Sequence, residues 1–262
     1  MPSAAFFDLD NTLIRGSSLF HVGRDLARTG LVPRRQLARF AAAQFRYVYT
    51  RTEIRGGAQG LASQLIGLIA GQEACHVARE CDHAVRRVFP RVAVPRVISH
   101  VRAHQKLGRP TYLVTASPRE IASRISEILG MDGYLATELE IVDGFYTGRL
   151  AAPVVHGPRK AAEVAVLAAR DGIRLDASYM YSDSANDLPL LRQVRYPVVV
   201  NGNRDMFTVA LNEGWAFLDT DRPERSLWPA KCPDPLAAKD VVAGDGSVVP
   251  LADHLHHAHV DR

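Results

Sequence analysis

The chain alternates between short apolar runs and longer segments with helical periodicity. The uninterrupted apolar run at residues 4–7 is followed directly by Asp8, which predicts a short strand buried on both faces. From about residue 17 to residue 90, apolar side chains recur at spacings near three and four, which predicts helices. A helical segment is therefore expected to interrupt the sheet after its first strand.

Strand and helix alternate regularly after residue 95. Helices are predicted over residues 97–106, 118–129, 158–171 and 185–193, and strands over 111–115, 134–136, 178–182 and 196–200. Residues 138–150 predict a β-hairpin that turns at Asp143-Gly144. This alternation predicts an α/β fold with a doubly wound, mostly parallel sheet. The expected division is a core of residues 1–14 and 91–220, a helical cap of residues 15–90, and a C-terminal extension of residues 221–262.

The composition fits a globular enzyme. The chain has 262 residues, of which 47% are hydrophobic and 23% charged, and this length can bury a sizeable core. The formal net charge of +4 is modest, although nine arginines stand against two acids between Arg15 and Arg55. We expect a solvated helical surface there and no nucleic-acid partner, because nucleic-acid binders carry a denser basic stripe.

Cysteine usage and hydropathy favour a cytoplasmic protein. The three cysteines lack the CxxC spacing of a zinc site or redox pair, so we expect reduced thiols. Asp8 and Asp10 cut off the N-terminal apolar run before a signal-peptide core can form. The longest uncharged run, residues 56–72, falls short of a comfortable membrane span. No pattern indicates the oligomeric state.

Acidic side chains follow two of the predicted strands. Asp8 and Asp10 come after the first strand, and Asp183 comes after the strand at 178–182. Ligands of open α/β sheets bind outside the carboxyl ends of the strands, so these carboxylates are expected to share one site. A carboxylate attacks a phosphate dianion only when a cation neutralises the approach, and carboxylate oxygens suit Mg²⁺.

Two further positions point to phosphate. Ser117 and Glu120 have capping-box spacing, so a helix N-terminus is expected after Thr115, where free N–H groups and the threonine hydroxyl would face phosphate oxygens. Lys160 stands at the start of a predicted helix, where a cation is unfavourable to the helix dipole. Phosphate binding explains its position, and an exposed surface lysine is the alternative. Asp187 has two interpretations, a capping box with Ser184 or the orientation of metal-bound water.

Together these positions resemble the four motifs of the haloacid dehalogenase superfamily, over most of residues 4–218. The DxDxT pattern is met by Asp8, Asp10 and Thr12, and the later motifs by Thr115, Lys160, Asp183 and Asp187. The helical segment is similar to the type I cap. The sequence YSDSANDLPLL at 181–191, in which Asn186 matches, is similar to the phosphoserine phosphatase-like branch of subfamily IB.

The resemblance implies a role for each of these residues. Asp8 would attack phosphorus to give an aspartyl-phosphate, and Asp10 would act as general acid and base. Mg²⁺ would be held by the Asp8 carboxylate, the Asp10 backbone carbonyl and Asp183. The remaining roles are binding of the phosphoryl group by Thr115, Ala116, Lys160 and Asn186, and support of the site by Thr12 and Asp187.

The substrate is a small phosphorylated metabolite on this resemblance. Phosphoserine phosphatases usually carry a glutamate nine residues after the nucleophile, and this chain has Ser17 there, which argues against phosphoserine. Ser17 is itself a candidate for contact with the substrate. Arg51 and Arg55 are candidates for contact with an anionic substrate, with ordinary surface arginines as the alternative. The expected function is a magnesium-dependent phosphatase. The alternatives are a phosphotransferase with the same chemistry and a non-catalytic binding protein on the same fold.

Overall fold

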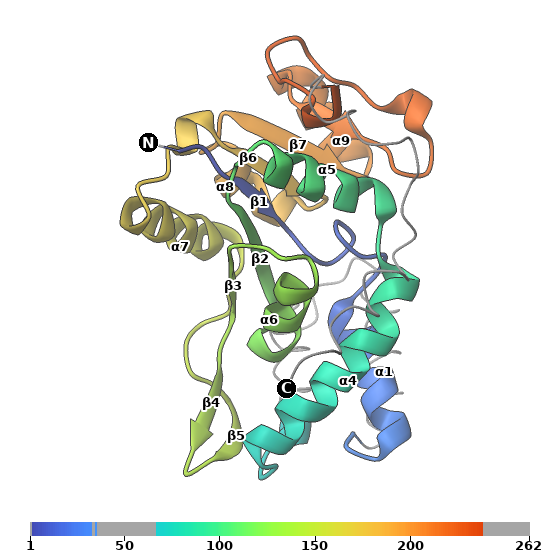
Figure 1. Cartoon of the computed structure of the whole chain (residues 1–262), viewed down its shortest axis with the longest axis vertical. Helices are drawn as coiled ribbons and strands as arrows, with labels where there is room; N and C mark the ends of the chain where they lie inside the picture. Colours follow the sequence, from blue (N-terminus) through green and yellow to red (C-terminus); the bar gives the residue numbers. More distant parts are fainter. Residues whose placement is uncertain (1, 33–34, 36–66, 238–262) are drawn as a thin grey trace.

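A parallel sheet forms the centre of the computed structural model, which describes residues 2–32, 35 and 67–237. Its six strands are arranged in the order β3-β2-β1-β6-β7-β8 (Figure 1). The strands are β1 (Ala5–Phe7), β2 (Thr111–Pro118), β3 (Gly133–Thr137), β6 (Tyr179–Ser182), β7 (Tyr196–Val200) and β8 (Ala216–Leu218). The predicted doubly wound α/β fold is confirmed.

Helices cover both faces of this sheet. One face carries α5 (Pro95–Lys106) and α6 (Arg119–Ile128), and the other carries α7 (Gly157–Arg170), α8 (Leu188–Leu191) and α9 (Arg204–Glu213). Side chains alternate along a strand, so the two buried phenylalanines of β1 serve opposite faces. Phe7 packs in the cluster that holds α5 and α6, while Phe6 packs in the cluster that holds α7 and α9.

The sequence pattern misses α9 and β8 and misplaces one helix. β8 has only three residues, too few for a clear alternation. The helix expected over 185–193 is instead a 3₁₀ turn at Ala185–Asp187 followed by α8, with Pro189 in the first turn of α8. Proline has no N–H to continue a preceding helix, so it favours a new start.

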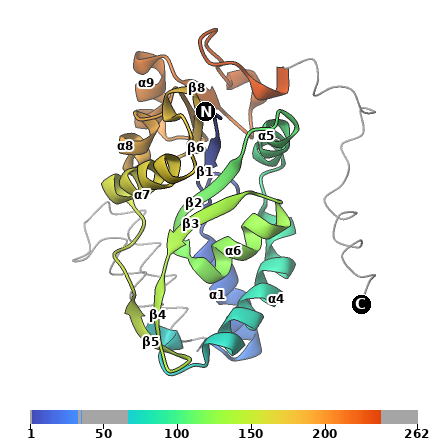
Figure 2. The ribbon, with the colours of Figure 1, turned by 60° about the vertical axis from the view of Figure 1, so that its left-hand side comes forward.

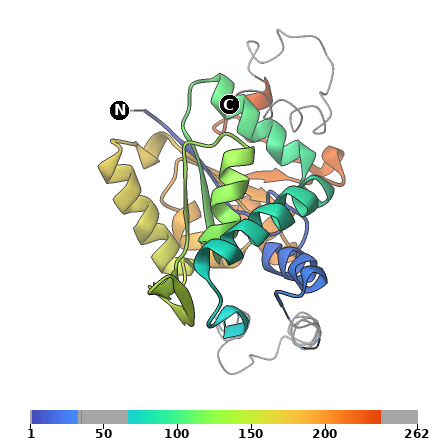
Figure 3. The same cartoon turned by 60° about the horizontal axis from the view of Figure 1, so that its bottom comes forward.

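The described part of the expected cap lies beyond the carboxyl ends of the strands. It consists of α1 (Ser18–Thr29), a 3₁₀ turn at Gly67–Ile69 and α4 (Ala74–Val92), and α1 and α4 lie side by side (Figure 3). The hairpin of β4 (Leu139–Val142) and β5 (Phe145–Leu150) turns at Asp143-Gly144, as predicted, and extends away from the sheet (Figure 2). α4 continues past residue 90, with Pro90 in its last turns, and the division into domains stays a prediction.

The start of the C-terminal extension covers the sheet beside α5. The backbones of Phe217 and Leu227 exchange hydrogen bonds of 2.8 and 2.7 Å, and the ring of Trp228 stacks on that of His100 at 5.4 Å. Short 3₁₀ turns occur at Pro223–Arg225 and Pro235–Ala237, and a further one at Leu175–Ala177 precedes β6. Residues 221–237 thus contribute to the folded core.

Among the described residues, no helix combines the length and the apolar character needed to cross a membrane.

Phe6→Ala is expected to destabilise the protein by about 3–5 kcal/mol, because Phe6 is fully buried between the sheet and α7. Phe145→Ala is the matched control, since Phe145 is 49% exposed on the hairpin, and we expect a change within about 0.5 kcal/mol. Urea unfolding followed by circular dichroism measures both. Equal losses for the two variants would contradict this account of the core.

Candidate active site

The switch point of the sheet lies between β1 and β6. β2, the next strand along the chain, joins β1 on one side, whereas β6 joins it on the other and the later strands continue from β6. Phe7 is in register with both Leu113 and Tyr181, and the Asp8 N–H donates to the Tyr181 carbonyl at 2.9 Å. The residues that follow β1 and β6 therefore lie level with the last residues of β2, at the edge where ligands of such sheets bind.

The loop after β1 turns back on itself before α1 begins. The Leu9 carbonyl accepts from the N–H groups of Leu13 and Ile14 at 2.9 and 3.1 Å. Asn11 has a positive φ of 57°, a conformation that asparagine tolerates better than most residues, and its side chain accepts from the Gly16 N–H at 3.1 Å. This turn brings the start of α1 to Asp10, whose Oδ1 accepts from the Ser18 N–H at 2.8 Å.

Lys160 lies between two carboxylates. Its Nζ donates to Asp8 Oδ1 and to Asp187 Oδ2, both at 2.8 Å. Lys160 is 3% exposed, Asp8 8% and Asp187 3%. The alternative of an exposed surface lysine is therefore wrong.

Asp187 takes part in this ion cluster and forms no capping box. Its Oδ2 also accepts from the Ser182 hydroxyl at 2.7 Å, whereas the Ser184 hydroxyl accepts from the Asn186 N–H. The charge of Lys160 outweighs the local hydrogen bond that the spacing predicts. A role for Asp187 in orienting metal-bound water stays a prediction.

Burial dominates the acid–base properties of the site. It raises the pKa of Asp8 to about 8, and the Lys160 ammonium offsets only part of this rise. Burial likewise raises the pKa of Asp183 to about 6 and that of Asp10 above its usual range. For Lys160, burial acts to lower the pKa, but Asp8 and Asp187 together hold it above the ordinary lysine range.

The carboxylates are close enough to act on one another. Asp183 raises the pKa of Asp8, and Asp10 raises that of Asp183, both through like-charge repulsion. Within the described residues, no three His, Cys, Asp or Glu side chains form a ready-made metal cluster. The carboxylates of Asp8 and Asp183 fit Mg²⁺ better than a metal that needs protein side chains at every coordination position. Mg²⁺ is usually bound through one or two carboxylates and keeps several waters.

The junction between β2 and α6 differs from the prediction of a capped helix N-terminus. α6 begins at Arg119 with Pro118 as its N-cap, and no side-chain hydrogen bond caps it among the described residues, so the expected capping box of Ser117 and Glu120 does not form. The Ser117 hydroxyl instead contacts Ser18 and Asp10, and Glu120 accepts from the Tyr146 hydroxyl at 2.7 Å. Tertiary partners displace the local cap in both cases.

The other expected phosphate contacts come from the loop after β1, the end of β2 and the turn after β6. The buried Thr115 hydroxyl accepts from the Ser117 N–H at 3.0 Å, and the Ala116 carbonyl accepts from Thr137 at 2.7 Å. Asn186 is exposed on the turn that packs against the N-terminus of α7. The Thr12 hydroxyl is buried and has no hydrogen-bond partner in the described part of the chain. Binding of phosphate by these residues stays a prediction.

The expected substrate contacts stay predictions. Ser17 is the N-cap of α1, and its hydroxyl accepts from the Phe20 N–H at 3.4 Å. Arg51 and Arg55 lie outside the described residues. Sequence reasoning also missed the parts that Ser18 and Ser182 play, because a serine beside an acidic motif carries no signal of its own until the fold shows what its hydroxyl meets.

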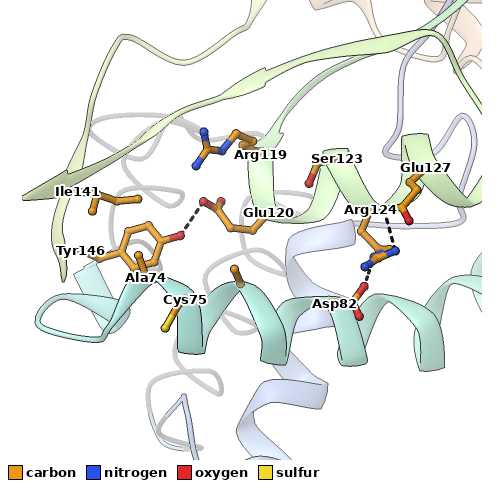
Figure 4. A pocket seen from close by; sticks show the side chains of 11 residues that line it. Ala74, Cys75, Asp82, Arg119, Glu120, Ser123, Arg124, Glu127, Ile141 and Tyr146 are labelled. Atoms are coloured by element: carbon orange, nitrogen blue, oxygen red, sulfur yellow. Dashed lines mark hydrogen bonds and ion pairs between the residues drawn. The ribbon is translucent and has the colours of Figure 1, made fainter. Parts of the chain in front are cut away.

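A pocket of about 440 Å³ opens between α4, α6 and the hairpin (Figure 4). Its charged side chains are largely paired, since Tyr146 bonds Glu120 while Arg124 contacts Asp82 and pairs with Glu127 at 2.8 Å. None of the predicted site residues in the described part of the chain lines this pocket.

Comparisons with known proteins point to one family. The family model described as haloacid dehalogenase-like hydrolase matches residues 5–192. The chain is 32% identical to phosphoserine phosphatase SerB1 of Mycobacterium tuberculosis (strain ATCC 25618 / H37Rv) over 219 residues, which are 84% of this chain and 71% of that protein. It is 29% identical to the histidinol-phosphatase of Neisseria meningitidis serogroup C, over 84% of this chain and 99% of that one.

A solved structure shows the same fold. The crystal structure of a protein of unknown function from Bordetella pertussis Tohama I is similar with a TM-score of 0.74 and 30% identity. The similarity covers 84% of this chain and 99% of that chain.

Lys160→Met is expected to destabilise the metal-free protein by about 3 kcal/mol at pH 8, because it leaves two buried carboxylates without their cation. The loss should shrink as the pH falls. Asp8 has a pKa of about 8 in the folded protein, above the ordinary value of 3.8. The stability that this group contributes is therefore present below pH 3.8 and is lost as the pH rises towards 8.

Urea unfolding in the presence of a chelator between pH 5 and pH 8 tests this prediction. Arg159→Met is the matched control, because Arg159 is the neighbouring cation and its ion pair within the described part of the chain is with Glu163, at a side-chain exposure of 38%. We expect its change to stay within about 0.5 kcal/mol at every pH. A Lys160→Met penalty that is equally large at pH 5 would contradict the charge argument.

Proposed function

Because the chain belongs to the haloacid dehalogenase-like hydrolase family, we propose that it hydrolyses a phosphate monoester of a small metabolite through a phosphorylated Asp8. The observation that carries this proposal is the buried Lys160 ammonium, 2.8 Å from an Asp8 carboxylate oxygen at the switch point of the sheet. A cation in that place can neutralise an incoming phosphoryl group and hold the attacking oxygen. The ion cluster lies at the edge of the sheet where ligands of such folds bind, and this position favours a ligand-binding role.

The first step transfers the phosphoryl group to the enzyme. An Asp8 oxygen forms a bond to phosphorus while the bond from phosphorus to the ester oxygen breaks. Asp10 gives its proton to the departing alkoxide, which leaves as an alcohol. The raised pKa of Asp10, caused by burial, favours the protonated form that this step requires.

The second step releases phosphate. Asp10, now ionised, takes a proton from a water molecule whose oxygen attacks phosphorus, and the Asp8 carboxylate departs. Lys160 stays beside Asp8 in both steps, and Asp187 and Ser182 hold Lys160 in place. Thr115 and the turn at Asn186 supply further contacts to the phosphoryl oxygens.

Mg²⁺ is part of this proposal. When bound, it offsets the repulsion between the Asp8 carboxylate and the phosphate dianion. The Asp8 and Asp183 carboxylates and the Asp10 backbone carbonyl would hold it. The raised pKa of Asp183, about 6 through burial, fits a group that gains a cation in the working enzyme.

A small phosphate monoester is the substrate class that the relatives support. The two phosphatases named above act on phosphoserine and on histidinol phosphate by their names, two different amine-bearing alcohols esterified with phosphate. Ser17, in place of the glutamate that usually recognises phosphoserine, argues for another member of this class.

Asp8→Asn is expected to lower kcat by at least about 1,000-fold, because an amide is a far weaker nucleophile toward phosphorus than a carboxylate. Phosphate release from a panel of monoesters with Mg²⁺ measures this, the panel being phosphoserine, histidinol phosphate, glycerol phosphate and sugar phosphates. Asp176→Asn is the control, since the Asp176 side chain is 71% exposed and pairs with Arg174 at the surface. An Asp8→Asn variant that keeps its turnover would sink the proposal.

The same panel separates the alternatives. Turnover that disappears with a chelator supports the phosphatase, and added glycerol that captures the phosphoryl group would indicate a phosphotransferase. Absence of phosphate release from every compound, with Mg²⁺ still bound in a titration, would favour the non-catalytic binding protein.

A further inference from the structure

Two serine hydroxyls meet beside Asp10, and neither belongs to the motifs that define the site. Ser18 Oγ and Ser117 Oγ are 2.6 Å apart, although 99 positions separate them in the sequence. Ser18 is 2% exposed and Ser117 5% exposed. The first lies in α1, in the segment expected to form the cap, and the second lies in the segment after Thr115 at the end of β2.

Both carboxylate oxygens of Asp10 have donors from this pair. Oδ1 accepts from the Ser18 N–H at 2.8 Å, and Oδ2 accepts from the Ser117 hydroxyl at 3.4 Å. A hydroxyl has one proton to donate. Two protons therefore serve two bonds, one from the pair to Asp10 and one between the hydroxyls, in which either serine can be the donor, and the three groups form one hydrogen-bonded chain.

This chain fixes how the Asp10 carboxyl group is turned. One donor comes from the backbone at the start of α1 and the other from the segment that ends β2, so rotation of the carboxyl group would break at least one bond. A buried hydroxyl left without its partner also carries a desolvation cost, which adds to the restraint. General acid catalysis depends on such orientation, because the proton must lie within hydrogen-bond reach of the leaving oxygen.

We propose that Ser117, supported by Ser18, is a positioning residue that holds Asp10 in the orientation needed to protonate the leaving group. The inference rests on the proposed function. It assigns to Ser117 a task different from that of Thr115 two residues earlier, which is expected to face the phosphoryl oxygens. It also makes the orientation of Asp10 depend on where α1 lies against the core.

The test compares leaving groups that need a proton with one that does not. Nitrophenolate departs from p-nitrophenyl phosphate unprotonated, whereas an alkoxide needs the proton of Asp10. We expect Ser117→Ala to slow phosphoryl transfer to Asp8 from an alkyl phosphate about tenfold, equivalent to about 1.4 kcal/mol. The burst of nitrophenolate from p-nitrophenyl phosphate should keep its rate within about twofold, since that step requires no acid.

Rapid-quench single turnovers with Mg²⁺ measure both rates, using the alkyl phosphate of the panel that the wild type hydrolyses fastest. Ser99→Ala is the matched control, because Ser99 is exposed on α5 and its hydroxyl donates to the Pro95 carbonyl of the same helix. Ser117→Thr keeps the hydroxyl and should restore most of the alkyl rate. If Ser117→Ala fails to fold, Ser18→Ala tests the same contrast between the two leaving groups. We expect it to slow transfer from the alkyl phosphate about threefold, because Ser117 can still donate to Asp10.

The outcomes separate this inference from the proposed function. Rates that fall in parallel for both leaving groups would show a structural role only, and rates that do not change would show no role; either result overturns the inference. A wild type that transfers no phosphoryl group from any monoester overturns the proposed function, and the inference with it.

Discussion

The ammonium group of Lys160, enclosed by the carboxylates of Asp8 and Asp187, is the interaction on which the arrangement of the site depends. A lysine that is 3% exposed loses nearly all of its hydration, and only close anionic partners make that placement tolerable. The three residues come from α7, from the end of β1 and from the turn after β6. One ion cluster therefore holds three segments of the chain at the same edge of the sheet.

The order of the strands explains why this cluster can exist. β1 lies between β2 and β6, so the segments that follow these strands converge although Asp8 and Lys160 are 152 positions apart. Helices on both faces keep the sheet rigid, with Phe6 and Phe7 anchoring β1 from opposite sides. The stacking of Phe7 on Tyr181, with ring centroids 4.5 Å apart, ties β1 to β6 immediately below the carboxylates. The site rests on a fully buried layer that leaves it little freedom to shift.

The site carries more acid than base. Asp8, Asp10 and Asp183 all have raised pKa values through burial, and Lys160 is the cation that the described residues place among them. This excess of acid supports the proposed binding of Mg²⁺ and, with that cation, of a phosphate group. Serine hydroxyls complete it at its edges, Ser182 on Asp187 and Ser117 on Asp10, and these neutral donors orient the carboxylates without cancelling their charge.

Local sequence patterns were enough to predict most of the alternation of strands and helices, the hairpin at Asp143-Gly144, and the acids that follow β1 and β6. Those features depend on local periodicity and turn chemistry, which a chain expresses within a few residues. Only the tertiary structure decided that Lys160 is buried, that Asp187 binds it and forms no cap, and that Ser117 turns to Asp10 and does not cap α6. It also decided that residues 221–237 complete the core. In each case a partner far away in the sequence offers a stronger interaction than the local one, and no local pattern records which distant groups the fold will bring together.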